Sequence, residues 1–323
     1  MTTLKDVAKK ANVSLSTVSY ALNDSSRITE ATKEKVRKAA QELGYVPNGV
    51  AKSLKRQKSE IISLFISGYK GPVFGQLIQG IQDVVNEKGY ELIVNASYNE
   101  HRLLKEKHFD GALVLNHRID DELVHEVASS QMPLVALDRF TVENPYISSV
   151  LIDNTQGISL AMEYLMQKKF TKIGFAGRNT TGLDGLERFD AYKGMLRKYD
   201  LPLVDNFVYD GHYEKEAAYN ELDTVIKNGV EVPEAIVCAN DEMALGIIDA
   251  LIENGYRVPN DVSIIGFDDI QLAKWGDTGL STIRVPLYEW GRSAAQALFL
   301  KLEGNEAVTH KRMPVELIKR NSG

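Results

Sequence analysis

The sequence predicts an N-terminal all-α helix-turn-helix head with a short hinge helix, followed by a two-lobed α/β body with parallel sheets. Three observations predict this fold. Residues 4–44 hold three short stretches with apolar side chains at helical spacing. From residue 61 onward, short apolar runs alternate with helical stretches. Residues 1–60 hold 12 Lys and Arg against 6 Asp and Glu, a net charge of +6, whereas the rest of the 323-residue chain carries −12. The two parts therefore have opposite electrostatics.

The expected helices of the head cover 4–10, about 14–23, and 29 to just before Gly44. Thr3 is the expected N-cap of the first helix, and Asp6 three residues later gives an acidic variant of the capping box. Asn12 tolerates the left-handed backbone that a tight turn into the second helix can need. A second helix entered by a tight turn is typical of helix-turn-helix units, which place that helix in the major groove.

The second helix is expected to present short hydroxyls and an aromatic ring instead of charges. Ser14 or Ser16 can cap it, Asn23 lies at its end, and its outward side consists of Leu15, Ser16, Thr17, Ser19 and Tyr20. Small polar side chains let a helix sit deep in a groove, where hydroxyls reach phosphates and base edges. The alternative is a small helical domain that docks a protein.

A basic segment, 47–59, follows the head. Asn48 can cap a helix of barely two turns, which is too short to be stable alone in water. Lys and Arg side chains surround its apolar ones; the basic residues are Lys52, Lys55, Arg56 and Lys58, and the apolar ones Val50, Ala51 and Leu54. The segment is either a basic linker or a hinge helix that folds on DNA, with Leu54 as a wedge in the minor groove.

The body is expected to alternate strands with helices. The predicted strands are 61–66, 91–94, 111–115, 134–137, 149–152, 172–176, 235–238 and 262–267. The predicted helices are 74–88, 120–130, 157–168, 186–199, 214–228 and 243–254. Nearly continuous apolar strands between helices are typical of parallel sheets covered on both faces. Two such halves indicate two lobes with a cleft between them.

Polar side chains follow several of these strands, where open parallel sheets bind ligands. They are Asp138 and Arg139 after 134–137, Asn240 and Asp241 after 235–238, and Asp268 and Asp269 after 262–267, joined by Arg188 and Tyr213. Carboxylate, amide and guanidinium groups suit sugar hydroxyls, and an aromatic face suits the C–H side of a sugar. Each Asp or Asn could instead be a helix cap.

Composition and motifs exclude other classes of protein. A single cysteine, Cys238, excludes a disulfide framework and a cysteine-rich zinc site. No apolar run reaches the roughly 18 residues of a transmembrane helix, and the first residues lack the apolar core of a signal peptide, so we expect a cytoplasmic protein. The phosphate-loop, dinucleotide, His-Glu-x-x-His and Gly-x-Ser-x-Gly patterns are missing. We expect no catalytic residue, metal or cofactor, with a sugar-handling enzyme as a formal alternative.

Ordered motifs along the chain resemble the lac repressor/galactose repressor (LacI/GalR) family of transcriptional regulators. The motifs of the head and hinge are Leu4-Lys-Asp-Val-Ala8, Val13-Ser-x-Ser-Thr-Val-Ser19, Leu43-Gly-Tyr-x-Pro-Asn48 and Val50-Ala-Lys-Ser-Leu54. Those of the body are Ala239-Asn-Asp-Glu-Met-Ala-Leu-Gly246, Val258-Pro-x-Asp-Val-Ser-Ile-Ile-Gly-Phe-Asp-Asp269 and Leu280-Ser-Thr-Ile283. The resemblance implies a body folded like periplasmic sugar-binding proteins, and a dimer.

By this resemblance, Leu15, Ser16 and Tyr20 occupy base-reading positions and Leu54 the intercalating one. The candidate DNA contacts are Thr3, Ser14, Leu15, Ser16, Thr17, Ser19, Tyr20, Asn23, Asn48, Ala51, Leu54 and Lys55. The candidate effector contacts are Phe74, Asp138, Arg139, Arg188, Tyr213, Asn240 and Asp268. The sequence departs from the family pattern at Tyr20, where Arg or His is common, and at Gly49, Ala191 and Gly279; the segment 99–109 is also shorter than in most members.

Together these features predict a sequence-specific DNA-binding regulator, a repressor of carbohydrate-utilisation genes controlled by a small sugar or sugar phosphate. It would bind near-palindromic double-stranded DNA as a homodimer, without a membrane. The expected domains are a head at 1–46, a hinge at 47–59 and a body at 60–323, whose lobes are 60–152 plus 285–312 and 153–284 plus 313–323. The alternatives are a cytoplasmic sugar-binding module acting through protein partners, or a regulator controlled by a corepressor or protein partner.

Overall fold

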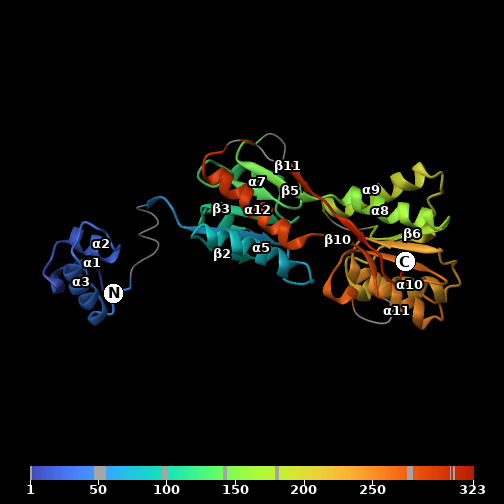
Figure 1. The fold of residues 1–323 in the computed structure, drawn as a ribbon, viewed down its shortest axis with the longest axis horizontal. Coiled ribbons are helices and arrows are strands. Elements are labelled where there is room, and N and C mark those ends of the chain that lie inside the picture. The colour runs from blue at the N-terminus through green and yellow to red at the C-terminus, as the bar shows by residue number, and fades with distance from the viewer. Residues whose placement is uncertain are drawn as a thin grey trace. The chain divides into compact units, whose positions relative to one another are not determined.

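A computed structural model describes residues 2–46, 56–96, 101–140, 144–178, 182–274, 279–305, 307 and 310–323. The chain divides into two compact units, Met1–Ser59 and Glu60–Gly323, each with its own core. Figure 1 shows the elements of both units. Within the ranges just given, no helix is both long and apolar enough to cross a lipid bilayer.

The first unit is all-α, as predicted. Its helices are α1 (Leu4–Ala11), α2 (Leu15–Leu22) and α3 (Glu30–Glu42). Thr3 caps α1 with the expected capping box, in which Asp6 Oδ2 accepts the Thr3 N–H at 2.8 Å. Asn12 ends α1 with a φ of +50°, the left-handed turn that the sequence indicated. The three helices pack around buried Val7, Val18 and Val36.

The second unit contains two six-stranded sheets with helices on both faces, so the predicted α/β body is confirmed, and the sheets, predicted to be parallel, are parallel except for one strand pair. The first sheet has the strand order β11-β5-β4-β3-β1-β2, and all its neighbours are parallel. Its strands are β1 (Ile61–Ile66), β2 (Glu91–Asn95), β3 (Gly111–Leu115), β4 (Leu134–Ala136), β5 (Ile147–Ile152) and β11 (His310–Met313). Its helices are α5 (Phe74–Glu87), α6 (Arg102–Lys105), α7 (Asp121–Val127) and α12 (Leu287–Leu302).

The second sheet has the order β12-β10-β9-β8-β6-β7, parallel except for β12, which runs antiparallel to β10. Its strands are β6 (Ile173–Ala176), β7 (Val208–Tyr209), β8 (Ala235–Cys238), β9 (Ser263–Asp268), β10 (Ser281–Arg284) and β12 (Glu316–Ile318). Its helices are α8 (Asn154–Gln167), α9 (Leu183–Lys198), α10 (Lys215–Lys227) and α11 (Asp241–Glu253), with short 3-10 turns at Asp205–Phe207 and Gln271–Lys274.

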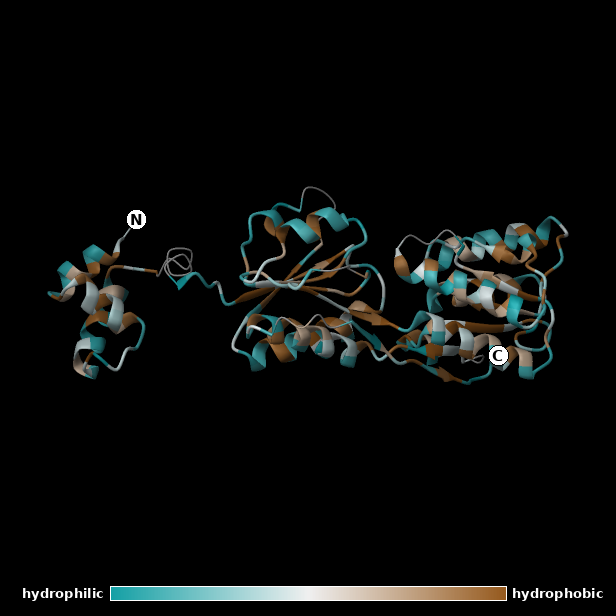
Figure 2. Ribbon diagram, turned by 90° about the horizontal axis from the view of Figure 1, so that it is seen from above, coloured by the Kyte–Doolittle hydropathy of each residue, from teal (hydrophilic) through white to brown (hydrophobic). Residues whose placement is uncertain are grey.

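Burial follows the pattern expected of covered parallel sheets. In Figure 2 the central strands are hydrophobic, whereas the outer faces of the helices are largely hydrophilic. Along β1, Leu64 packs into the core that includes α5 and α12, and its neighbour Phe65 packs into a second core that includes α6 and α7. Successive strand residues point to opposite faces, so each face needs its own apolar cover.

Helices α5 and α12 meet backbone to backbone. A Cβ on Gly80 would lie 2.1 Å from the Tyr288 carbonyl oxygen, and one on Gly291 would lie 2.2 Å from that of Leu77. Only glycine fits at such a crossing. The helix at 287–302 was not predicted, and neither were β7, β10, β11 and β12, because these strands are short and β11 reads as a polar, charged stretch.

The chain passes between the sheets three times: from β5 to α8, from β10 to α12, and from β11 to β12. Each connection starts at the carboxyl end of a strand, namely β5, β10 or β11. These strand ends, which belong to both sheets, therefore face the space between the sheets. Helix α9 begins at Leu183, three residues before the predicted start, and places Arg188 in its second turn.

Candidate functional site

The exposed side of α2 carries the predicted DNA-contacting side chains. Ser14 is the N-cap: its Oγ accepts the Thr17 N–H at 3.1 Å and also lies 2.8 Å from the Ser16 and Thr17 hydroxyls. Val18 and Ala21 are buried against the other helices. Leu15 is 46% exposed and Tyr20 38% exposed, and both lie on the same helix as the exposed hydroxyls. Open side chains of this kind are typical of a recognition surface.

Arg27 joins this surface, although sequence reasoning missed it. Its Nη1 donates to the Tyr20 hydroxyl at 3.3 Å, and its guanidinium carbon lies 5.6 Å from the centre of the Tyr20 ring. The loop position of Arg27, seven residues away, carries no periodic signal that links it to α2. A guanidinium beside an aromatic ring adds a phosphate-binding or guanine-binding group to the hydroxyl-rich face.

The remaining predicted DNA contacts fall into two groups. Thr3, Ser19 and Asn23 belong to the described head, where the Thr3 hydroxyl donates to Asp6 at 2.7 Å and Asn23 Nδ2 donates to the Ser19 carbonyl at 2.7 Å. Four others lie outside the described residues and stay predictions; they are Asn48, Ala51, Leu54 and Lys55.

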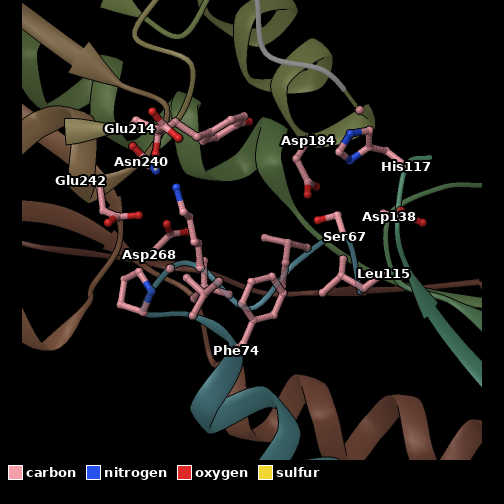
Figure 3. A pocket seen from close by; sticks show the side chains of 18 of the residues that line it. Ser67, Phe74, Leu115, His117, Asp138, Asp184, Glu214, Asn240, Glu242 and Asp268 are labelled. Carbon is pink, nitrogen blue, oxygen red and sulfur yellow. Dashed lines mark hydrogen bonds between the residues drawn. The ribbon is translucent and has the colours of Figure 1, made fainter. Parts of the chain in front are cut away.

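A cavity of about 680 Å³ lies between the two sheets of the body, at the carboxyl ends of their strands. Six of the seven predicted effector contacts line it, namely Phe74, Asp138, Arg188, Tyr213, Asn240 and Asp268. Figure 3 shows Glu214, Asn240, Glu242 and Asp268 gathered on one side, with Asp184, His117, Asp138 and Ser67 on the other. Ile152 at the end of β5, Val285 between β10 and α12, and Trp290 of α12 complete the lining.

Arg188 is held rigidly in this lining. It is 5% exposed, its Nε donates to Asn154 Oδ1 at 2.8 Å, and its Nη1 donates to the Ala239 carbonyl. Its guanidinium carbon stacks 3.7 Å from the centre of the Phe267 ring. Stacking and two fixed acceptors orient the remaining N–H groups, so a ligand meets a preorganised donor.

Asp268 faces Arg188 at the limit of an ion pair, with 4.0 Å between its Oδ1 and the Arg188 Nη1. Burial raises the pKa of the Asp268 carboxyl to about 7, against the opposing effect of Arg188. Its backbone has a φ of +116°, and Tyr213 in the same lining has a φ of +62°. Non-glycine residues held in this region store strain, which clusters at functional sites.

Asp138 and Arg139 separate at the end of β4. Asp138 is 8% exposed and lines the cavity, and burial raises the pKa of its carboxyl despite its bonds to Arg139. Arg139 does not line the cavity, contrary to the expectation from sequence. Neighbouring residues at a strand end face opposite ways, so Arg139 instead donates to Asp138 at 3.0 Å, Asp121 at 2.7 Å and the Asn116 carbonyl at 2.6 Å. Arg139 therefore holds the Asp138 carboxylate in place without lining the cavity itself.

Asn240 has both of the roles expected of a polar residue after a strand, because it caps a helix and also lines the cavity. Its Oδ1 accepts the Met243 N–H at 2.9 Å and caps α11, while its Nδ2 donates to the Tyr213 carbonyl at 3.2 Å beside the cavity. Its neighbour Asp241 is buried and does not line the cavity, because its carboxylate accepts the Ile270 N–H at 2.9 Å.

Sequence reasoning missed several lining residues. Glu242 follows the β8 strand end by the same rule that found Asn240, so that signal was present. Asp184 follows a strand end less directly, and Trp290 belongs to the unpredicted α12. Among the described residues, no three His, Cys, Asp or Glu side chains are grouped so that they could hold a metal ion. Aromatic rings beside carboxylates and a fixed guanidinium suit a small polyhydroxylated molecule.

Comparison with known proteins gives consistent likenesses. A model described as "Bacterial regulatory proteins, lacI family" matches residues 3–48, and one described as "Periplasmic binding protein-like domain" matches residues 162–323. The "HTH-type transcriptional repressor PurR" of Vibrio atlanticus (strain LGP32) is 32% identical over 314 residues, 95% of this chain and 93% of that one. The "Probable HTH-type transcriptional repressor ExuR" of Bacillus subtilis (strain 168) is 31% identical over 96% of this chain and 95% of that one.

Two solved structures are also similar. A lac repressor dimer bound to operator and the anti-inducer ONPF has a TM-score of 0.84 and 25% identity, covering 99% of this chain and 98% of that chain. A complex of the transcriptional regulator CelR with cellobiose has a TM-score of 0.74 and 25% identity, covering all of both chains. The likeness therefore extends over the head and the body together.

Proposed function

The chain belongs to the lacI family of bacterial regulatory proteins, and we propose that it represses carbohydrate-utilisation genes under the control of a small sugar bound in the cavity of its body. The observation that carries this proposal is the pairing of two features in one chain. One is the exposed, hydroxyl-rich α2, and the other is a cavity lined by carboxylates, aromatic rings and the fixed Arg188.

At the DNA end, a homodimer presents two α2 helices to successive major grooves of a near-palindromic operator. The short side chains of Ser16 and Ser19 let the helix approach closely, and Leu15, Tyr20 and Arg27 supply contacts to base edges. A hinge helix with Leu54 as a minor-groove wedge completes the proposal, and Leu54→Ala should weaken specific binding if the wedge exists. We also propose the domain bounds 1–46, 47–59 and 60–323, the last with two lobes.

At the effector end, a ligand in the cavity touches residues of both sheets at once. Asp138 and Phe74 come from the first-sheet half, and Arg188, Asn240 and Asp268 from the second. A ligand that bridges them favours one relative arrangement of the two halves, and so biases operator binding. Effector and operator are then coupled reciprocally, typically by about 1–3 kcal/mol. We propose that the sugar acts as an inducer; a corepressor would reverse the sign.

The charge of the lining favours a neutral sugar over a sugar phosphate. Among the described lining residues, carboxylates outnumber the Lys and Arg side chains; they are Asp138, Asp184, Glu214, Glu216, Glu242 and Asp268, against Lys70, Arg118, Arg188 and Lys215. Burial raises the pKa of the Asp138 and Asp268 carboxyls, so this space already disfavours negative charge, and a phosphate would place a further anion beside these carboxyl groups. We further propose that the protein acts in the cytoplasm and as a regulator, not as an enzyme.

A paired experiment tests this function. Fluorescence anisotropy measures binding to the promoter beside its own gene and to palindromes selected from random DNA, at a fixed salt concentration. Calorimetry then measures binding of D-glucose, D-galactose, D-ribose, cellobiose and the purines hypoxanthine and guanine. Specific operator binding that a sugar changes supports the proposal. Binding of a purine and of no sugar overturns the effector class, and DNA binding that ignores sequence favours a module that acts through protein partners.

A further inference from the structure

A buried asparagine behind the cavity holds two of its lining side chains at once. Asn154, the first residue of α8, is fully buried and does not line the cavity. Its Oδ1 accepts from Arg188 Nε at 2.8 Å. Its Nδ2 donates to Asp184 Oδ1 at 2.8 Å and to Glu187 Oε2 at 2.9 Å. Asn154 therefore fixes one donor and one acceptor of the lining, Arg188 and Asp184.

The chemistry at this position requires an amide. A guanidinium needs an acceptor on one side of Asn154, and two carboxylates need a donor on the other. Aspartate would place a third carboxylate against Asp184 and Glu187, and an apolar residue would leave the Arg188 Nε without its buried acceptor. The single residue type that serves both sides at this length is asparagine.

The same network reaches the first sheet. Glu187 accepts a bidentate pair from Arg312 of β11, with Nη2 at 2.6 Å from Oε1 and Nη1 at 3.1 Å from Oε2. Arg312 also donates to the Ile152 carbonyl at 3.2 Å and stacks on Phe140 at 4.8 Å. Glu187 and Arg312 lie outside the cavity lining. Helix α9, which carries Asp184 and Arg188, is thus tied to the last strand of the opposite sheet.

From these contacts we infer that Asn154 is a positioning residue for the effector, and that the Glu187–Arg312 pair makes the position of Arg188 depend on how the two sheets are aligned. The inference rests on the proposed function. When the sheets shift relative to each other, Arg312 pulls on Glu187, and Asn154 transmits the movement to both lining side chains. Sugar binding and sheet alignment are then coupled through Arg312, Glu187, Asn154 and Arg188, which are joined in one series of hydrogen bonds.

Three variants of the full-length chain test this inference. Asn154→Ala removes the amide. Glu187→Gln removes the charge that pairs with Arg312 but keeps the shape of the side chain. Lys198→Met is the matched control. Lys198 pairs with Glu163 at 3.0 Å, which joins the same two helices α9 and α8 on an exposed face. Each variant is titrated with whichever of D-glucose, D-galactose, D-ribose or cellobiose binds the unchanged chain most tightly, and hydrogen exchange at the Arg188 Nε–H is followed by NMR with and without that sugar.

Asn154→Ala should weaken sugar binding by about ten- to hundredfold, as expected for loss of one hydrogen bond to a charged group. It should also speed exchange at the Arg188 Nε–H, while operator affinity without sugar stays within about twofold. Glu187→Gln should reduce the factor by which sugar changes operator affinity, by about two- to thirtyfold. Lys198→Met should leave each quantity within about twofold.

A merely structural role predicts something else: lower stability with unchanged sugar affinity and unchanged Nε–H exchange. Either that result for Asn154→Ala, or a Glu187→Gln chain with a normal sugar response, overturns the inference. If no sugar binds the unchanged chain, the proposed effector class fails instead, and the exchange rate at the Arg188 Nε–H alone then decides whether Asn154 positions that side chain.

Discussion

Replacing Asp268 by Asn should stabilise the body and weaken sugar binding. Asp268 is nearly buried, and the Arg188 guanidinium at 4.0 Å is too distant to offset the burial of its charge. Its pKa is therefore raised from 3.8 to about 7. Asparagine keeps the shape and tolerates the positive φ of +116° better than most residues do. Asp268→Asn thus removes the buried charge with little other change.

The sign and size of the effect follow from the two pKa values. Below pH 3.8 the Asp268 carboxyl is protonated in both folded and unfolded chains, so its ionisation does not lower the free energy of unfolding. As the pH rises, the unfolded chain releases its proton first, so folding becomes less favourable between pH 3.8 and about 7. At pH 8 the full difference corresponds to about 4 kcal/mol, and at pH 5 to less than about 2 kcal/mol. The variant should therefore gain up to about 4 kcal/mol at pH 8 and clearly less at pH 5.

Urea unfolding at pH 8 and pH 5, at one protein concentration, measures these gains. Trp290 is buried in the body, so tryptophan fluorescence reports the unfolding of the body. The same preparation should bind its sugar at least about tenfold more weakly, because a charged acceptor is lost. A variant that is no more stable than the parent at pH 8, or whose gain does not shrink toward pH 5, would show that Asp268 is not a destabilising buried charge.

Three further predictions concern the two sites. Arg188→Met should abolish the effect of sugar on operator binding but leave sugar-free operator affinity within about twofold. Fluorescence anisotropy measures both affinities, and an unchanged effect of sugar would disprove the role of Arg188 in effector binding. Tyr20→Phe should lower discrimination at one operator position by about 1 kcal/mol, since the hydroxyl that Arg27 contacts is lost; affinities for single-base operator variants measure it, and an unchanged profile would count against Tyr20. Adding a 6-phosphate to the preferred hexose should weaken binding by about tenfold or more, and calorimetry that finds equal or tighter binding would contradict the charge argument.

Much of the fold followed from periodicity and capping. The capping box of Thr3 and Asp6 and the left-handed Asn12 could be predicted because they depend on neighbours within four residues. The strands of the parallel sheets could be predicted because burial on both faces makes them uniformly apolar. The strand β11 could not, because His310 and Lys311 are polar and exposed and Arg312 is polar and half-buried, and it is a strand through pairing with distant β5.

The residues of the site could likewise be predicted only where the signal is local in sequence. The rule that ligands bind beyond strand ends found Asp138, Asn240 and Asp268 from local sequence. It could not tell that Arg139 turns away, since that depends on which face of β4 meets the cavity. Asn154 follows a strand end too, but its partners Asp184 and Glu187 lie 30 and 33 residues away, and no local pattern reveals such a pairing.

We propose that one chain links a sugar in the body to DNA bound by the head. The operator dissociation constant, measured at one salt concentration with and without a saturating sugar, tests it most directly. We expect the sugar to change this constant by about five- to 150-fold, and Arg188→Met to remove the change. A sugar that binds the cavity while the operator constant stays the same would contradict it.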